Sequence, residues 1–94
     1  MKELVLTPKF KRAFRKFARR DPKLPNRIEG LLTQMQADVF SPNLGSHKLS
    51  GELAGLWACS CGYDCRIVFA IERHTETGNE VVVLLDIGTH DEVY

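Results

Sequence analysis

Residues 65–85 read CRIVFAIERHTETGNEVVVLL, and this stretch decides the fold class. Residues 65–71 alternate between two sides of an extended chain, with an apolar side formed by Cys65, Ile67, Phe69 and Ile71. A period of two is typical of a strand with one buried face. Residues 81–85 are all valine or leucine, as expected for a central strand. The polar residues 73–79 between them are a short connection, so the two strands are predicted to pair antiparallel.

Two more strands are expected upstream of this pair. Residues 4–6 (LVL) form a short first strand, and residues 56–61 form a strand whose one face carries Trp57, Cys59 and Cys61. Residues 62–64 (GYD) indicate a turn into the next strand, and residues 40–46 are a loop by their Pro, Asn, Gly and Ser content. After residue 85 the chain is predicted to end in a polar tail, residues 86–94.

Two helices are predicted between the first strand and the loop, because the apolar period there is 3.6. Phe10, Phe14 and Phe17 recur at i, i+4 and i+7, behind Thr7 as N-cap and Pro8 at the first helical position. The second helix is expected to begin around residues 24–26, and its apolar stripe consists of Ile28, Leu31, Leu32 and Met35. The expected order is β-α-α-β-β-β. We therefore predict an α+β fold, residues 1–94 as one domain, with an antiparallel sheet packed on an N-terminal two-helix hairpin.

Composition excludes several classes of protein. The 94 residues, 44% hydrophobic and 27% charged, are typical of one small globular domain. No apolar run approaches the roughly 20 residues of a membrane helix, and residues 1–6 (MKELVL) do not resemble a secretory signal. Cys59, Cys61 and Cys65 are odd in number and lack the paired CxxC spacing of zinc sites. We expect free thiols packed as small apolar residues, no metal or cofactor, no membrane partner, and a reducing, cytoplasmic location.

The net charge of +1 conceals two oppositely charged halves. Residues 1–36 carry ten basic and three acidic residues, and residues 37–94 carry three basic and nine acidic residues. A basic half suggests attraction to a polyanion or to an acidic partner protein. The alternative is a solvated helix face.

Three polar residues lie on or beside the predicted sheet. Arg66 lies inside an apolar strand. It is either an edge arginine whose guanidinium group reaches water, or a phosphate-binding residue, because the planar guanidinium can donate to two anionic oxygens at once. His90 follows Gly88, which permits a turn back over the sheet, and His47 follows the loop. Histidine exchanges protons near neutral pH, although a solvated role is open for His47. No serine-hydrolase, zinc-protease or nucleotide-binding motif is present, and the set suits metal-free phosphodiester chemistry on RNA.

Four segments resemble, in order and spacing, the RelE/ParE superfamily of bacterial type II toxins. They are HKLSG (47–51), GLW (55–57), DCRIVF (64–69) and VLLDIGTHDEVY (83–94), and the last is most similar to the RelE and YafQ-like branches. The resemblance implies a toxin of a type II toxin–antitoxin system. It implies a metal-independent, ribosome-dependent mRNA endonuclease that cleaves at the A site. Its expected partners are a cognate antitoxin, the ribosome and mRNA, and operator DNA only through the antitoxin complex.

The resemblance also implies site residues. His47 or Asp64 would assist deprotonation of the ribose 2′-OH, and Arg66 would hold the scissile phosphate. His90 would protonate the leaving oxygen or exchange roles with His47, and Tyr94 would stack on or orient the substrate. Steering toward RNA is assigned to Lys48, Arg12, Arg15, Lys16 and Arg19.

Two departures from the YafQ-like pattern leave other functions open. Ser60 stands where those members carry a second histidine, and Asp86 stands where they carry an arginine. One alternative is a ParE-like poison of DNA gyrase, against which the set of His47, Arg66 and His90 argues. The other is a catalytically weak member that acts mainly in an antitoxin-bound autorepressor complex.

Overall fold

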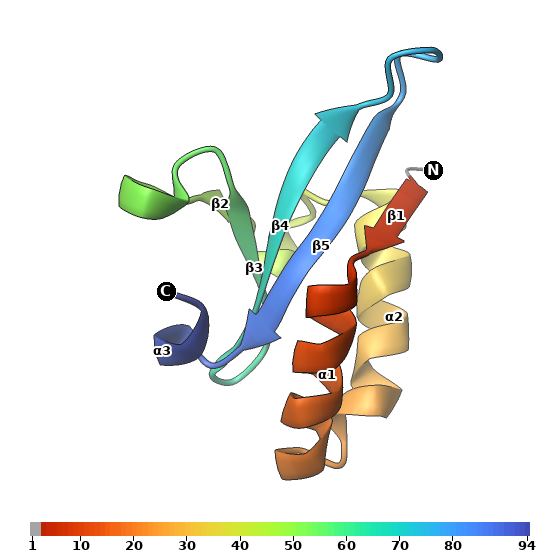
Figure 1. Cartoon of the computed structure of the whole chain (residues 1–94). Helices are drawn as coiled ribbons and strands as arrows, with labels where there is room; N and C mark the ends of the chain where they lie inside the picture. Colours follow the sequence, from red (N-terminus) through yellow and green to blue (C-terminus); the bar gives the residue numbers. More distant parts are fainter. Residues whose placement is uncertain (1–2) are drawn as a thin grey trace.

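The computed structural model describes residues 3–94. Met1 and Lys2, which belong to the N-terminal segment predicted not to be a secretory signal and to the basic half of the chain, lie outside the described residues. The elements are β1 (Glu3–Leu6), α1 (Pro8–Arg20), α2 (Leu24–Ala37), the 3-10 turn η1 (Pro42–Leu44), β2 (His47–Lys48), the 3-10 turn η2 (Gly51–Leu53), β3 (Trp57–Gly62), β4 (Cys65–Arg73), β5 (Glu80–Gly88) and α3 (His90–Val93). The α1–α2 hairpin packs on one face of the five-stranded sheet (Figure 1), which confirms the predicted α+β fold. No helix between Glu3 and Tyr94 has the length and apolar character needed to cross a membrane.

The sheet is mixed rather than wholly antiparallel. Its strand order is β1-β5-β4-β3-β2, and β1 runs parallel to β5, while the other neighbours are antiparallel. The helical hairpin carries the chain from β1 at one edge of the sheet to β2 at the opposite edge. The antiparallel strands β2 to β5 then return across the sheet, so β5 lies between β1 and β4, which explains why residues 81–85 are uniformly apolar.

The prediction of a polar tail over residues 86–94 is wrong. β5 continues to Gly88, because the register shift near Asp86 keeps Ile87 on the buried face. The chain then forms the short helix α3. Thr89 and Glu92 make a reciprocal capping box at its start, and this local bonding replaces the extended tail.

The start of α1 is fixed to the sheet by Thr7. Its hydroxyl accepts from the main-chain N–H of Phe10 (3.1 Å) and donates to the carbonyl of Leu84 (2.8 Å). This confirms Thr7 as the N-cap and places the aromatic stripe against β5. Phe10 and Phe17 are buried there, whereas Phe14 is only partly covered.

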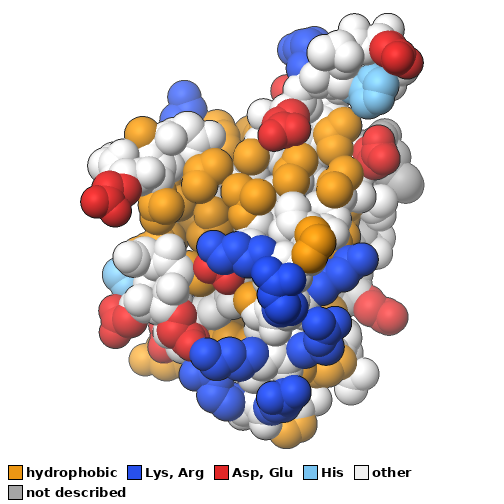
Figure 2. Space-filling view, in the orientation of Figure 1, with side chains coloured by type: hydrophobic (Ala, Val, Ile, Leu, Met, Phe, Trp, Pro, Cys, Tyr) orange, Lys and Arg blue, Asp and Glu red, His pale blue; other side chains and the backbone are white. Residues whose placement is uncertain are grey.

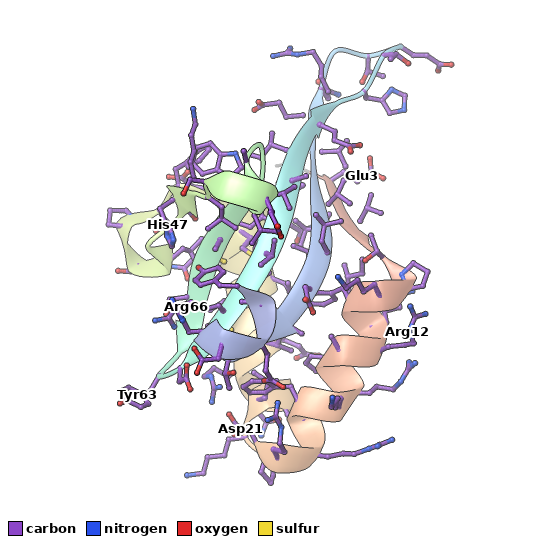
Figure 3. All side chains as sticks on the ribbon, turned by 60° about the vertical axis from the view of Figure 1, so that its left-hand side comes forward. Glu3, Arg12, Asp21, His47, Tyr63 and Arg66 are labelled. Atoms are coloured by element: carbon purple, nitrogen blue, oxygen red, sulfur yellow. A yellow bond between two sulfur atoms is a disulfide. The ribbon has the colours of Figure 1, made fainter. Side chains whose placement is uncertain are left out.

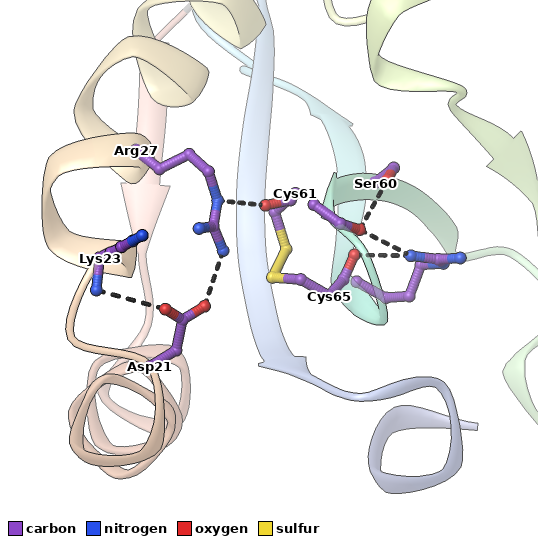
Figure 4. A network of polar contacts seen from close by, with 8 residues as sticks. Asp21, Lys23, Arg27, Ser60, Cys61 and Cys65 are labelled. Atoms are coloured by element: carbon purple, nitrogen blue, oxygen red, sulfur yellow. Dashed lines mark hydrogen bonds and ion pairs between the residues drawn. A yellow bond between two sulfur atoms is a disulfide. The ribbon is translucent and has the colours of Figure 1, made fainter.

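The cysteine prediction is wrong for two of three residues. Cys61 and Cys65 form a disulfide across the β3–β4 turn, where antiparallel pairing brings their Cα atoms to 4.9 Å, and only Cys59 is a free, buried thiol. Burial raises the pKa of Cys59 to about 12, so its thiol stays protonated. Figure 4 shows that Arg27 of α2 reaches this turn, with its Nε donating to the carbonyl of Cys61 (2.8 Å). Cysteine content therefore no longer supports a reducing compartment.

Reducing the disulfide should destabilise the fold by about 2 kcal/mol, because the loop closed by Cys61 and Cys65 is only five residues long. Urea unfolding with and without dithiothreitol measures the free energy of unfolding. The double variant Cys61→Ala/Cys65→Ala should not respond to the reductant. Equal midpoints for the oxidised and reduced wild-type protein would contradict the expectation.

Candidate functional site

The candidate site lies on the sheet where β2, the start of β4 and α3 come together. Figure 3 shows His47 and Arg66 on the same side of the molecule, with Arg12 of α1 well apart from both. His90 and Tyr94 reach the site because α3 turns back beside β4 after Gly88. Five residues predicted from the sequence are thus brought into one region from β2, the β3–β4 turn, β4, α3 and the residue after α3: His47, Asp64, Arg66, His90 and Tyr94.

Tyr94 is the residue that joins the two histidines. Its Oη lies 3.4 Å from Nε2 of His47, and its ring packs edge-on against the ring of His90, with centroids 4.5 Å apart. The other ring nitrogen of His47, Nδ1, lies 3.1 Å from the carbonyl oxygen of Gly45. Partial burial raises the pKa of Tyr94, while the positive charge of Arg66 acts in the opposite direction. Two imidazoles and a neutral phenol therefore share one open surface near a guanidinium.

Arg66 is held on one side by the β3–β4 hairpin. Its Nη1 donates to the carbonyls of Cys65 (2.8 Å) and Gly62 (3.3 Å). Ser60, which pairs with Arg66 across the strands, donates its hydroxyl to the same Gly62 carbonyl (3.3 Å). Within residues 3–94 no other hydrogen bond of this guanidinium is observed, so Nε and Nη2 retain donors for a phosphate.

The structure gives the Asp64 carboxylate a main-chain partner. Oδ1 of Asp64 accepts from the N–H of His90 (3.1 Å), so the β3–β4 turn holds the first residue of α3. Asp64 adopts the left-handed conformation (φ 49°), which aspartate tolerates better than most residues. This contact positions His90. The predicted role of Asp64 in deprotonation stays a prediction.

Asp86, the other departure from the YafQ-like pattern, makes its contacts with β5 and α1. Its Oδ1 accepts from the main-chain N–H of Ile87 (2.9 Å), and its Oδ2 lies 3.8 Å from Nζ of Lys9 on α1. The carboxylate is therefore engaged with α1 and with its own strand.

A residue that the sequence analysis did not single out, Glu92, anchors α3. Its carboxylate accepts from the N–H of Thr89 (3.0 Å) and from Nη2 of Arg20 on α1 (2.7 Å). These contacts, led by the Thr89 N–H, lower the pKa of Glu92 to about 2. The Thr-x-x-Glu spacing of residues 89–92 is a capping-box signal, so the anchor was detectable in the sequence.

Glu92 should make stability depend on pH below about 4.5. A carboxyl group whose pKa is lowered by folding stabilises the protein above its ordinary pKa of 4.5, and this contribution is lost as pH falls toward about 2. Urea midpoints of Glu92→Gln and wild type should therefore converge as pH falls from 5 toward 2. Glu76→Gln, in the exposed β4–β5 loop, is the matched control and should follow wild type. A constant gap between Glu92→Gln and wild type across that range would exclude this role.

The predicted substrate-steering residues divide into two groups. Lys48 lies beside the site on β2, with its Nζ 5.5 Å from the centroid of the Trp57 ring. Arg12, Arg15, Lys16 and Arg19 are exposed on α1. Figure 2 shows basic side chains gathered over the helices, below an apolar area that covers the sheet. The helix residues thus form a border to the sheet face and do not join the histidine pair.

The arrangement brings together side chains of the types that can exchange protons and bind an anion. His47 at the Tyr94 hydroxyl and His90 at the Tyr94 ring provide two imidazoles, and Arg66 provides a cation held by two carbonyls. Among residues 3–94 no cluster of three or more His, Cys, Asp or Glu side chains is arranged to hold a metal ion.

Comparisons with known proteins establish the fold. No family model matches the chain, and no curated protein matches it by sequence. Among solved structures, YafQ from E. coli superimposes with a TM-score of 0.75 at 14% identity, covering 100% of this chain and 99% of YafQ. The YoeB/ParE toxin from Agrobacterium tumefaciens gives 0.72 at 18% identity, covering 94% and 98%. The E. coli DinJ–YafQ toxin–antitoxin complex gives 0.72 at 15% identity, covering 99% and 97%. The chain therefore has the RelE/YafQ-like toxin fold.

Proposed function

We propose that this protein is the toxin of a type II toxin–antitoxin system and a metal-independent mRNA endonuclease that cleaves at the ribosomal A site. The observation that carries the proposal is the meeting of His47, Tyr94 and His90 beside Arg66. The fold supports it, since YafQ, with which the chain superimposes over its full length, occurs in a toxin–antitoxin complex with DinJ.

The proposed reaction is attack of the ribose 2′-OH on the adjacent phosphate. His47 removes the 2′-OH proton, and Asp64 either assists or only positions His90. The free donors of Arg66 bind the phosphate and stabilise the charge that develops in the transition state. His90 gives a proton to the departing 5′-oxygen, and the two histidines can exchange these roles. Tyr94, which contacts both imidazoles, stacks on or orients the substrate.

The proposed partners follow from this activity. A cognate antitoxin would inhibit the toxin, and operator DNA would be bound only through the toxin–antitoxin complex. The ribosome and its mRNA would be engaged in the cytoplasm, with Lys48 at the site and the basic residues of α1 at its border. Because these contacts are electrostatic, cleavage should fall as salt concentration rises.

Expression in cells without an antitoxin tests the proposal against its two alternatives. The endonuclease should stop incorporation of labelled amino acids before incorporation of labelled thymidine, and growth should resume when a cognate antitoxin is supplied. A gyrase poison would stop thymidine incorporation first. A catalytically weak autorepressor would not slow growth, and either result would overturn the proposal.

A further inference from the structure

We propose that the hollow beside Tyr94 binds a nucleobase of the RNA substrate and that Glu52 selects guanine there. The proposal rests on the proposed endonuclease function and adds a determinant of base preference to it. The hollow has a volume of about 380 Å³ and is lined by Leu49, Ser50, Glu52, Leu53 and Tyr94. Tyr94 is shared with the candidate site, so a base in the hollow would belong to a nucleotide whose phosphate lies near Arg66 and the two histidines.

The wall of the hollow is preformed by local hydrogen bonds. The segment from Leu49 to Leu56 is closed by the N–H of Leu49 donating to the carbonyl of Leu56 (2.9 Å). Within it, the N–H of Leu53 donates to the carbonyl of Ser50 (3.3 Å), and the N–H of Leu56 donates to the carbonyl of Leu53 (3.0 Å). Gly51 permits the tight turn, because its φ of 67° lies in the left-handed region. The main chain that carries the lining residues 49, 50, 52 and 53 is therefore held by its own hydrogen bonds.

The lining matches the parts of a nucleobase. Tyr94 offers a partly exposed aromatic ring for stacking, and Leu49 and Leu53 offer apolar surface for the rest of the base. Glu52 is exposed at the rim, and among residues 3–94 its carboxylate makes no hydrogen bond or ion pair with another side chain. A free carboxylate next to a stacking platform can read the hydrogen-bonding edge of a base.

Guanine fits a carboxylate best among the four bases. Its Watson–Crick edge presents two adjacent donors, N1–H and the 2-amino group, to the two carboxylate oxygens of Glu52. Adenine and cytosine present one donor beside an acceptor nitrogen. Uracil presents one N–H between two carbonyl oxygens, which the carboxylate repels. A bidentate contact of this kind favours guanine over uracil by about tenfold or more.

Two measurements test the inference. The first is the rate of cleavage on ribosomes programmed with mRNAs that carry guanine, inosine or uracil at each position of the A-site codon. The second is NMR titration with short RNAs in which a 2′-deoxy sugar at the cleaved position prevents cleavage, following the methyl groups of Leu49 and Leu53. Glu52→Gln is the test variant. Glu72→Gln, an exposed acid on β4, is the matched control.

Wild type and Glu72→Gln should prefer guanine over uracil by about tenfold at one codon position. Inosine, which lacks the 2-amino group, should fall between the two bases. In Glu52→Gln this difference should fall to within about threefold. If wild type and Glu52→Gln both cleave and show the same ratio of guanine to uracil cleavage rates, the inference is overturned and the endonuclease proposal stays intact. Guanine-selective binding without any cleavage would support the hollow and overturn the endonuclease proposal. Absence of both binding and cleavage would overturn both.

Discussion

Replacing His90 by glutamine should lower the rate of mRNA cleavage by about 10²- to 10⁴-fold, the usual contribution of one general acid or base. The imidazole is exposed, packs edge-on against Tyr94 and lies 3.5 Å from the Asp91 carboxylate, so we expect the variant to keep the fold. Glutamine can keep a hydrogen bond but cannot transfer a proton near neutral pH. Single-turnover cleavage on programmed ribosomes measures the change.

A second histidine provides the control for this variant. His74 is exposed in the β4–β5 loop, which Figure 1 shows at the opposite end of the sheet from α3. His74→Gln should cleave at the wild-type rate. If His90→Gln also cleaves at that rate, the imidazole of His90 is not the acid or the base, and the proposed mechanism is wrong.

Replacing Arg66 by alanine should lower cleavage by about 10²- to 10³-fold, as expected when a donor to the developing charge is removed. Arg66→Lys keeps the charge but loses the planar fork, so its rate should lie between wild type and Arg66→Ala. Arg73→Ala, at the far end of the same strand, is the matched control. Because Arg66 also binds the carbonyls of Cys65 and Gly62, urea unfolding must show that each variant is folded. Wild-type cleavage by folded Arg66→Ala would exclude the phosphate-binding role.

Much of the fold was predictable because local pattern and tertiary packing agree. The Phe10, Phe14 and Phe17 stripe and the Thr7 cap predicted α1, and the structure packs that stripe against the sheet, with Phe14 partly covered. The parallel pairing of β1 with β5 was not predictable from periodicity, since both orientations require the same alternation of apolar residues. The helix α3 was missed because four residues are too few for a period, although its capping box is present in the sequence.

The structure places the candidate site residues in one region, but the contacts between them could not be predicted from the sequence. Sequence spacing cannot show that the phenol of Tyr94 meets His47, which is 47 positions earlier in the chain. It also cannot show that Asp64 is bonded to the main chain of His90. The disulfide was missed because an odd cysteine count suggested free thiols, whereas the tight turn between β3 and β4 brings Cys61 and Cys65 together.

The most direct test of the central claim is primer extension on a defined mRNA with purified protein, with and without programmed ribosomes. The account predicts cuts at the A-site codon that appear only when ribosomes are present and that His90→Gln and Arg66→Ala both greatly reduce. Intact mRNA in both reactions, from protein shown by circular dichroism to be folded, would contradict the endonuclease proposal and favour a gyrase poison or an inactive repressor.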